Sequence, residues 1–147
     1  GHLCLATLHA TTTTHALERV VRVFPEEARH QILADLAQNL VALIGQRLVP
    51  ALTQRRAVSV ELMLATAHIR DLIQRGLLAD IREAIGRARE QGVQTCDQHL
   101  FELYEAGKIS VEEALRHADS RTDLTLRIKL GKQISSHDLP FHMQDAE

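Results

Sequence analysis

The chain opens with an uncharged run of small and apolar residues over positions 3–8. Such an unbroken run is typical of a strand buried on both faces, as in a parallel sheet. Thr7 and His9 stand at its end, and four threonines at 11–14 offer hydroxyls that suit the start of a helix. Carboxyl ends of strands and N-termini of helices are common phosphate sites, so this junction is a candidate binding site. The same pattern also fits a buried strand whose His9 only hydrogen-bonds a nearby carbonyl.

Helical periodicity follows the threonines. Apolar residues at 16, 17, 20, 21 and 23 predict a short helix that is capped by Thr13 or Thr14 and ends before Pro25. Apolar residues then recur every four positions and predict a long amphipathic helix, with the spacing carried by Ala28, Ile32, Leu36, Leu40 and Ile44. Residues 46–50 and 57–64 predict two strands turned at 53–56, because apolar residues alternate with smaller or polar ones at Val58, Val60, Leu62 and Leu64.

Everything after residue 65 is predicted to be helical. One helix ends at Gly76 and a second, starting near Leu78, ends at Gly92. Two capping boxes, at 95–98 and 110–113, each open a further helix. The last residues are polar and aperiodic, and we expect them to form a disordered tail. The pattern thus predicts an α/β part over 1–65, a helical part over 66–130 and a tail over 131–147.

Composition limits the possible classes of protein. The 147 residues suffice for one core, which must be built from Leu, Ile, Val and Ala because aromatic residues make up only 3%. A formal charge of −2 gives no electrostatic case for binding nucleic acid or an anionic membrane. No apolar run approaches the roughly 18 residues of a membrane span. A chain that opens on a predicted core strand without an initiator Met is expected to be the C-terminal piece of a longer protein.

Many segments, in order, resemble one family. Gly1-His2-Leu3 followed by 6–10, Ala-Thr-Leu-His-Ala, is similar to the histidine box of the type II/IV secretion ATPases, and within them to the PilT/PilU pilus-retraction branch. Further matches run to about residue 130, at 19–27, 46–50, 69–73, 92–98, 103–107 and 112–115. The residues at 39–40, 118–120 and 126–130 favour PilU-like members. The resemblance implies the C-terminal part of a RecA-like P-loop ATPase core, with few strands, followed by an all-helical bundle.

The resemblance also implies a function for the parent protein. It would be a cytoplasmic, hexameric motor at the inner-membrane pilus machinery, using ATP and Mg²⁺ to retract type IV pili in twitching motility. His9 would lie beside the γ-phosphate as a sensor of the nucleotide state, with Thr7 assisting through its hydroxyl. The implied partners are identical subunits, a paralogous retraction ATPase and the inner-membrane platform protein, and no nucleic acid. A pilus extension or type II secretion ATPase, or a non-enzymatic helical interaction module, are the alternatives.

Residues 67–76 resemble the AIRNLIRE motif of the same family, which is associated with retraction, although His68 and Gln74 depart from it. The resemblance makes one run of five residues the candidate for motor coupling, namely Ile69, Arg70, Asp71, Leu72 and Ile73. Helical spacing places the three apolar residues of this run in the core and leaves Arg70 free to contact a neighbouring subunit or helix. The same pattern also fits a plain amphipathic helix whose arginine is solvated.

Two parts that ATP hydrolysis requires have no match in this sequence. Neither the phosphate-binding G-x-x-x-x-G-K-[ST] pattern nor an apolar strand ending in paired acids for magnesium is present. We therefore expect this chain alone to take up no cofactor and to be inactive as an ATPase. Nine histidines and two cysteines lack H-E-x-x-H or C-x-x-C spacing, so no metal site is expected, and Cys4 and Cys96 fit reduced thiols of a cytosolic protein.

Overall fold

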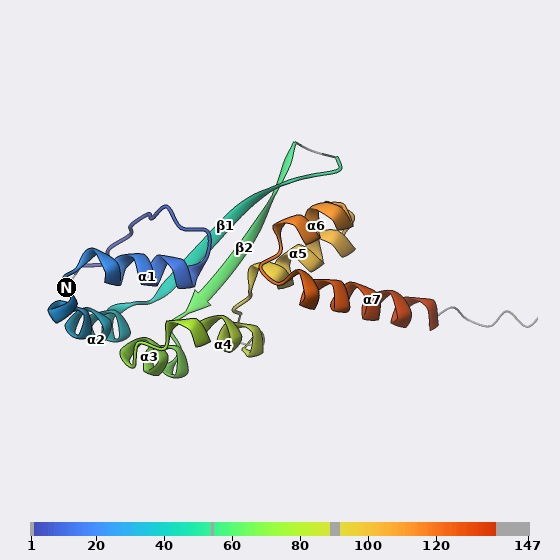
Figure 1. Cartoon of the computed structure of the whole chain (residues 1–147). Helices are drawn as coiled ribbons and strands as arrows, with labels where there is room; N and C mark the ends of the chain where they lie inside the picture. Colours follow the sequence, from blue (N-terminus) through green and yellow to red (C-terminus); the bar gives the residue numbers. More distant parts are fainter. Residues whose placement is uncertain (1, 54, 89–91, 138–147) are drawn as a thin grey trace, which may run out of the picture.

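The described chain is an elongated set of helices arranged along one β-hairpin (Figure 1). The computed structural model describes residues 2–53, 55–88 and 92–137. In chain order the elements are α1 (Thr13–Val23), α2 (Arg29–Asn39), β1 (Ala42–Pro50), β2 (Arg56–Leu64), α3 (Ala67–Gln74), α4 (Ile81–Arg87), α5 (Cys96–Glu105), α6 (Val111–His117) and α7 (Arg121–His137). Short 3₁₀ turns at Glu26–Ala28 and Leu78–Asp80 lead into α2 and α4.

The hairpin is antiparallel, with an unbroken register from Ala42 opposite Leu64 to Pro50 opposite Arg56. This confirms the predicted strand pair, although Arg56, predicted to lie in the turn, is the first residue of β2. The buried face of β2 carries its smaller and polar residues together with one methionine, namely Ala57, Ser59, Glu61 and Met63. The alternating apolar residues that signal the strand, such as Val58, lie on the other face, where Ile44 and Leu48 of β1 are also exposed. The alternation along β2 therefore predicts the strand correctly. However, the face that is buried carries mostly the smaller and polar residues and not the apolar ones.

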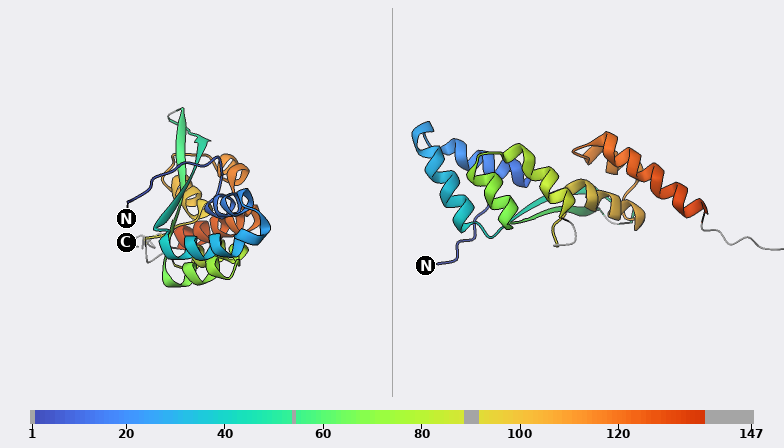
Figure 2. Two further views of the ribbon diagram at one scale, coloured as in Figure 1. Left: turned by 90° about the vertical axis from the view of Figure 1, so that its left-hand side faces the viewer. Right: turned by 90° about the horizontal axis from the view of Figure 1, so that it is seen from below.

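Two hydrophobic clusters form the core, one toward each end of the hairpin. The first joins α1 to α4 with Met63 near the end of β2. The second joins α5, α6 and α7 with Val49 and Ala57 near the turn. The views of Figures 1 and 2 agree, with α1–α4 gathered on one side and α5–α7 on the other. Helices α3 and α4 thus share a core with α1 and α2, and the expected division into domains at residue 65 stays a prediction.

The prediction of one long helix as far as Ile44 is wrong. Helix α2 ends at Asn39, Leu40 is extended with φ −63° and ψ 134°, and Ile44 pairs with Leu62 in the sheet. The spacing of four continued by coincidence, since short apolar runs rich in branched residues fit helix and strand equally well. Tertiary contacts end the helix. The guanidinium of Arg70 donates hydrogen bonds to carbonyls at the C-terminal end of α2, and the nine-residue ladder with β2 satisfies the backbone groups that follow.

The predicted buried strand at the start of the chain is also wrong. Residues 2–10 form no regular element, and Leu3 and Leu5 are 81% and 90% exposed. A strand needs a neighbour for its N–H and C=O groups, and among the described residues β1 and β2 pair only with each other and with Gln94. The apolar composition of this segment remains suited to burial, but the described chain supplies no layer that covers it.

The start signals of the helices are mostly confirmed. Thr95 and Gln98 form a complete capping box, in which each side chain accepts from the backbone N–H of the other residue. The second box is half formed, because Ser110 Oγ accepts from the N–H of Glu113 at 3.2 Å while the Glu113 carboxylate turns to Arg116. Helix α3 ends as predicted before Gly76, whose φ of +72° is a conformation that glycine adopts without strain.

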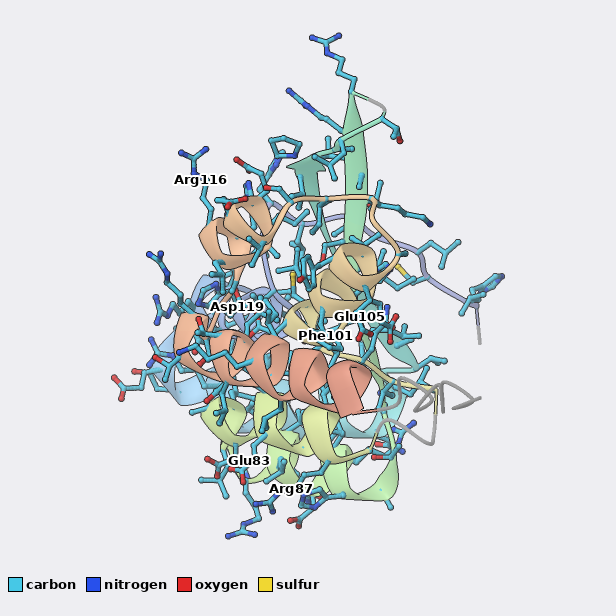
Figure 3. All side chains as sticks on the ribbon, turned by 90° about the vertical axis from the view of Figure 1, so that its right-hand side faces the viewer. Glu83, Arg87, Phe101, Glu105, Arg116 and Asp119 are labelled. Carbon is cyan, nitrogen blue, oxygen red and sulfur yellow. The ribbon has the colours of Figure 1, made fainter. Side chains whose placement is uncertain are left out.

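Helix α7 runs to His137, so the first seven residues of the expected tail are helical. At Gly131 helix α7 lies against α5: a Cβ at this position would stand 3.4 Å from Phe101 Cζ, in van der Waals contact. One turn earlier, the Arg127 guanidinium lies 4.6 Å from the ring centre of Phe101, the α5 residue that Figure 3 labels. These contacts hold α7 against α5 as far as Gly131. The rest of the predicted tail, 138–147, lies outside the described residues.

The two cysteines should differ strongly in reactivity. Cys4 is exposed, whereas Cys96 is 2% exposed, and its burial raises the pKa of its thiol. The thiolate is the reactive form, so at pH 8 we expect iodoacetamide to modify Cys4 and to leave Cys96 untouched in the native chain. Mass spectrometry of the intact protein measures this, and in denaturant both residues should react. Rapid labelling of Cys96 under native conditions would contradict the packing of α5 on the hairpin.

Candidate functional site

The N-terminal end of α1 is anchored to the sheet. Thr12, one residue before the predicted caps, is the N-cap, and its Oγ1 accepts from the N–H of His15 at 3.2 Å. The buried Thr13 donates its N–H to Glu61 Oε1 at 2.7 Å, and its hydroxyl donates to the same oxygen. Glu61 lies on β2 and is 3% exposed. A carboxylate from the strand thus satisfies donors at the positive end of the helix and fixes its position.

Just before α1 the chain passes over Gly45 of β1, close enough for van der Waals contact. A Cβ at this position would lie 3.6 Å from both the carbonyl oxygen of Thr11 and the Cα of Thr12, and 3.4 Å from Glu61 Cβ. The approach brings the threonine run directly onto the strand pair. The predicted junction before α1 therefore lies directly on the β-hairpin, although the segment that leads into it is not a strand.

His9 and Thr7 both lie in the exposed segment before α1. The backbone carbonyl of His9 accepts from Arg19 Nη1 at 2.8 Å, which ties the segment to the second turn of α1. An open hollow of about 1050 Å³ lies beside this contact, between the segment, α1 and β1, and its lining includes Leu8, His9, Thr11, His15, Arg19 and Gln46. The structure thus places His9 at the hollow, whereas Thr7 lies outside its lining.

The candidate coupling segment in α3 divides into inner and outer residues. Ile69, Leu72 and Ile73 are buried in the first core cluster, as the helical spacing predicts. Asp71 is exposed and pairs with Arg75 at 3.2 Å, one turn along the helix. The inner residues therefore hold α3 in the core, and Asp71 is the member of the segment that faces solvent.

Arg70 is not free, which corrects the expectation from helical spacing. Its Nε donates to the carbonyl of Ala65 at 2.8 Å, and its Nη2 donates to that of Leu40 at 3.0 Å. Its Nη1 donates to the carbonyls of Ala37 and Gln38. The bonds to Ala37, Gln38 and Leu40 satisfy carbonyls that the end of α2 leaves without intrahelical partners. The residue fastens α3 to α2, a role that helical spacing alone does not reveal.

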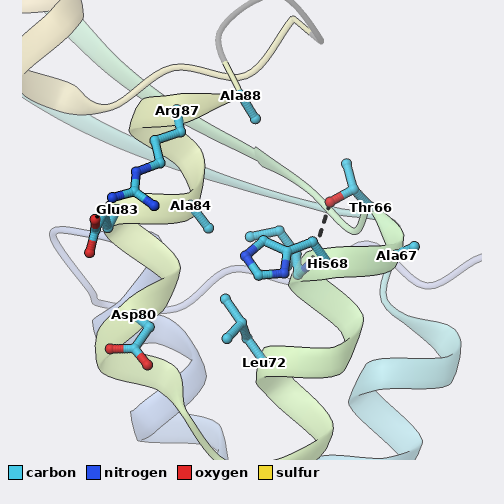
Figure 4. Close-up of a pocket in the computed structure, with 10 residues that line it drawn as sticks. Thr66, Ala67, His68, Leu72, Asp80, Glu83, Ala84, Arg87 and Ala88 are labelled. Carbon is cyan, nitrogen blue, oxygen red and sulfur yellow. Dashed lines mark hydrogen bonds and ion pairs between the residues drawn. The ribbon is translucent and has the colours of Figure 1, made fainter.

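A cleft of about 560 Å³ separates the first turn of α3 from α4 (Figure 4). Its floor includes Leu72 and Ala84, and polar side chains line its rim, namely His68, Asp80, Glu83 and Arg87. Glu83 pairs with Arg87 one turn further along α4. His68, which departs from the family motif, therefore lies at the edge of a cleft and not in the core.

Polar contacts at the start of α7 were missed by the sequence reasoning. Asp97 accepts from the backbone N–H groups of Asp119 and Ser120 and pairs with Arg82 at 2.5 Å. Asp119 in turn accepts from Arg47 of β1 at 2.8 Å (Figure 3). Burial acts to lower the pKa of Arg47, but the hydrogen bond to Asp119 and nearby negative charges raise it on balance. These partners lie 15 to 72 positions apart, and no local pattern signals them.

Two further observations concern the described residues alone. Over 2–53, 55–88 and 92–137, no group of three or more His, Cys, Asp or Glu side chains is placed to hold a metal ion. Within the same residues, no helix combines the length and apolar character needed to cross a bilayer.

Comparison with known proteins places the chain in a family. Residues 1–138 match the model of the type II/IV secretion system proteins. The type IV pilus ATPase PilU of Pseudomonas aeruginosa is 46% identical over 141 residues, which are 95% of this chain and 37% of PilU. The type IV pilus retraction ATPase PilT of the same species is 36% identical over 118 residues, which are 80% of this chain and 34% of PilT. A crystal structure of the pilus retraction motor PilT with bound ADP superposes with a TM-score of 0.72 and 28% identity, covering 81% of this chain and 33% of that one.

The chain therefore belongs to the type II/IV secretion system protein family, and its fold is the C-terminal part of the ATPase core with the helices that follow it. Within that family it belongs with the PilT/PilU relatives. It spans between a third and two fifths of the length of these relatives. The resemblance that the histidine box and the later segments carry is thereby confirmed.

Proposed function

We propose that this chain is the C-terminal portion of a hexameric, ATP-driven motor that retracts type IV pili in twitching motility. The observation that carries the proposal is the 46% identity with PilU, sustained over 95% of the chain. The parent protein would bind and hydrolyse ATP in the cytoplasm, at the inner-membrane pilus machinery. Its partners would be identical subunits, a paralogous retraction ATPase and the platform protein, and no nucleic acid.

The hollow at α1 supports a role for this chain beside the nucleotide. His9 and His15 offer ring N–H donors there, and Thr11 offers a hydroxyl, a donor set that fits phosphate oxygens. The same lining does not fit Mg²⁺, because its one carboxylate, Glu18, is paired with Arg22 at 3.6 Å. We therefore assign the metal and most of the nucleotide to the remainder of the parent, and expect this chain alone to be inactive.

In this proposal His9 senses the nucleotide state. When ATP is bound, it supplies the γ-phosphate whose transfer to water is the reaction. The imidazole of His9 would donate one N–H to a phosphate oxygen, with the Thr7 hydroxyl as an assistant, and this bond is lost once the phosphate has left. Because α1 is fastened to β2 through Glu61, a movement of the His9 segment would be passed to the sheet and, through β2, to the start of α3.

Replacing His9 with alanine in the parent should slow ATP turnover about 10- to 150-fold. The estimate assumes the loss of one hydrogen bond to a charged group, roughly 1.5–3 kcal/mol, in the transition state. Steady-state kinetics on the purified parent would measure it, with the melting temperature as a check on folding. His30→Ala is the matched control, since His30 is an exposed residue of α2 away from the hollow. Unchanged kinetics in His9→Ala would rule out the sensor.

We further propose that residues 69–73 couple the motor to movement, with roles for the single residues that differ from those expected from helical spacing. Ile69, Leu72 and Ile73 set the position of α3, Arg70 links it to the end of α2, and the exposed Asp71 is the residue available to a neighbouring subunit or protein. The contact between subunits that helical spacing suggested for Arg70 is therefore reassigned to Asp71.

A further inference from the structure

Arg19 makes the contact between α1 and the segment that carries His9. Its guanidinium reaches back ten positions along the chain and donates from Nη1 to the backbone carbonyl of His9 at 2.8 Å. Among the described residues, no other side chain hydrogen-bonds to the backbone of residues 2–10. The other backbone contact within this segment is a local turn, in which the N–H of Ala10 donates to the carbonyl of Leu8. Among the described residues, Arg19 thus provides the side-chain link between α1 and the main chain of His9.

The helix that carries Arg19 is itself rigidly placed. Leu17, two positions earlier, is 1% exposed in the first core cluster. Thr13, at the first turn, is bonded to the buried carboxylate of Glu61. Arg19 therefore projects from a fixed base, and a bond from such a base restricts where the main chain of His9 can lie.

We propose that Arg19 is a positioning residue for His9. By holding the carbonyl of His9, it keeps the imidazole at the hollow in the orientation that the bound phosphate requires. The inference rests on the proposed function of His9. It goes beyond that function by naming Arg19 as the residue that links the position of the histidine to α1. A guanidinium suits this role because its planar set of N–H donors holds a carbonyl in a defined direction, which a flexible ammonium does less well.

The test uses the purified parent protein and compares the single variants Arg19→Ala, Arg19→Lys and His9→Ala with the double variant of His9→Ala and Arg19→Ala. We expect Arg19→Ala to lower kcat about tenfold and Arg19→Lys to recover part of that loss. The double variant should turn over no more slowly than His9→Ala alone, because Arg19 acts only through the histidine. Arg29→Ala is the matched control, since Arg29 is exposed at the start of α2 and lies outside the lining of the hollow.

The outcomes separate the two proposals. If His9→Ala slows turnover while Arg19→Ala does not, the positioning role is overturned and the sensor stands. If the losses of the two single variants multiply in the double variant, Arg19 acts on the nucleotide directly and the positioning role is again overturned. If His9→Ala has no effect, both proposals are overturned. Melting temperatures are recorded for every variant, and Arg19→Gln replaces Arg19→Ala should the alanine variant not fold.

Discussion

Replacing Arg70 with alanine is expected to lower the free energy of unfolding by about 2–4 kcal/mol. The substitution removes donors from the carbonyls of Ala37, Gln38 and Leu40 at the end of α2, and from that of Ala65. Part-buried carbonyls that lose a charged donor bear most of this cost, and partial access of water to the site keeps it below the sum of the separate bonds. Urea denaturation followed by circular dichroism measures the change, and hydrogen exchange should show faster opening at the end of α2.

The same helix provides the control for this experiment. Arg75 pairs with Asp71, and both side chains are more than half exposed, so Arg75→Ala should change stability by less than about 1 kcal/mol. If Arg70→Ala and Arg75→Ala lowered the free energy of unfolding equally, the contacts of Arg70 with α2 would contribute no more to stability than an exposed ion pair. In the parent, Arg70→Ala should reduce ATPase activity and motility together, because the loss is one of folding. An effect confined to motility would instead favour a contact between subunits.

Replacing Glu61 with alanine is expected to cost about 2–4 kcal/mol in the free energy of unfolding. The change leaves the buried N–H and hydroxyl of Thr13 without an acceptor at the first turn of α1 and opens space under Gly45. Glu61→Gln should retain most of the stability, because an amide oxygen accepts the same two bonds. Thermal unfolding of the chain measures both variants.

A double-mutant cycle tests whether Glu61 acts through Thr13. In Thr13→Val the hydroxyl is lost and the backbone N–H is kept, so a coupling energy of about 1 kcal/mol or more with Glu61→Ala is expected. Glu83→Ala is the comparison for removing a carboxylate from the surface, since Glu83 is 65% exposed and pairs with Arg87 within α4. Additive losses in the cycle would mean that Glu61 stabilises the sheet without holding α1.

The candidate site was only partly accessible to sequence reasoning. The threonine run and His9 stood out because hydroxyls before an apolar helix have a local meaning. The structure places His9 and the first of these threonines, Thr11, in the lining of one hollow. Glu61 and Arg19 have no such local signature. Glu61 meets Thr13 only after the hairpin has folded against α1. Arg19 meets the carbonyl of His9 only after α1 has formed beside the segment that precedes it.

The sequence by itself determined the helix starts, the hairpin and the family. Hydroxyl caps, capping boxes and glycines at helix ends act within a few residues, so Thr95, Ser110 and Gly76 fix local structure wherever the elements later pack. Only the tertiary structure decided where α2 stops, which face of β2 is buried, and that the polar segment after Gly131 is helical. The end of α2 depends on Arg70, and the buried face of β2 depends on helices such as α5 that pack against it. Hydrophobic periodicity carries no information about such distant partners.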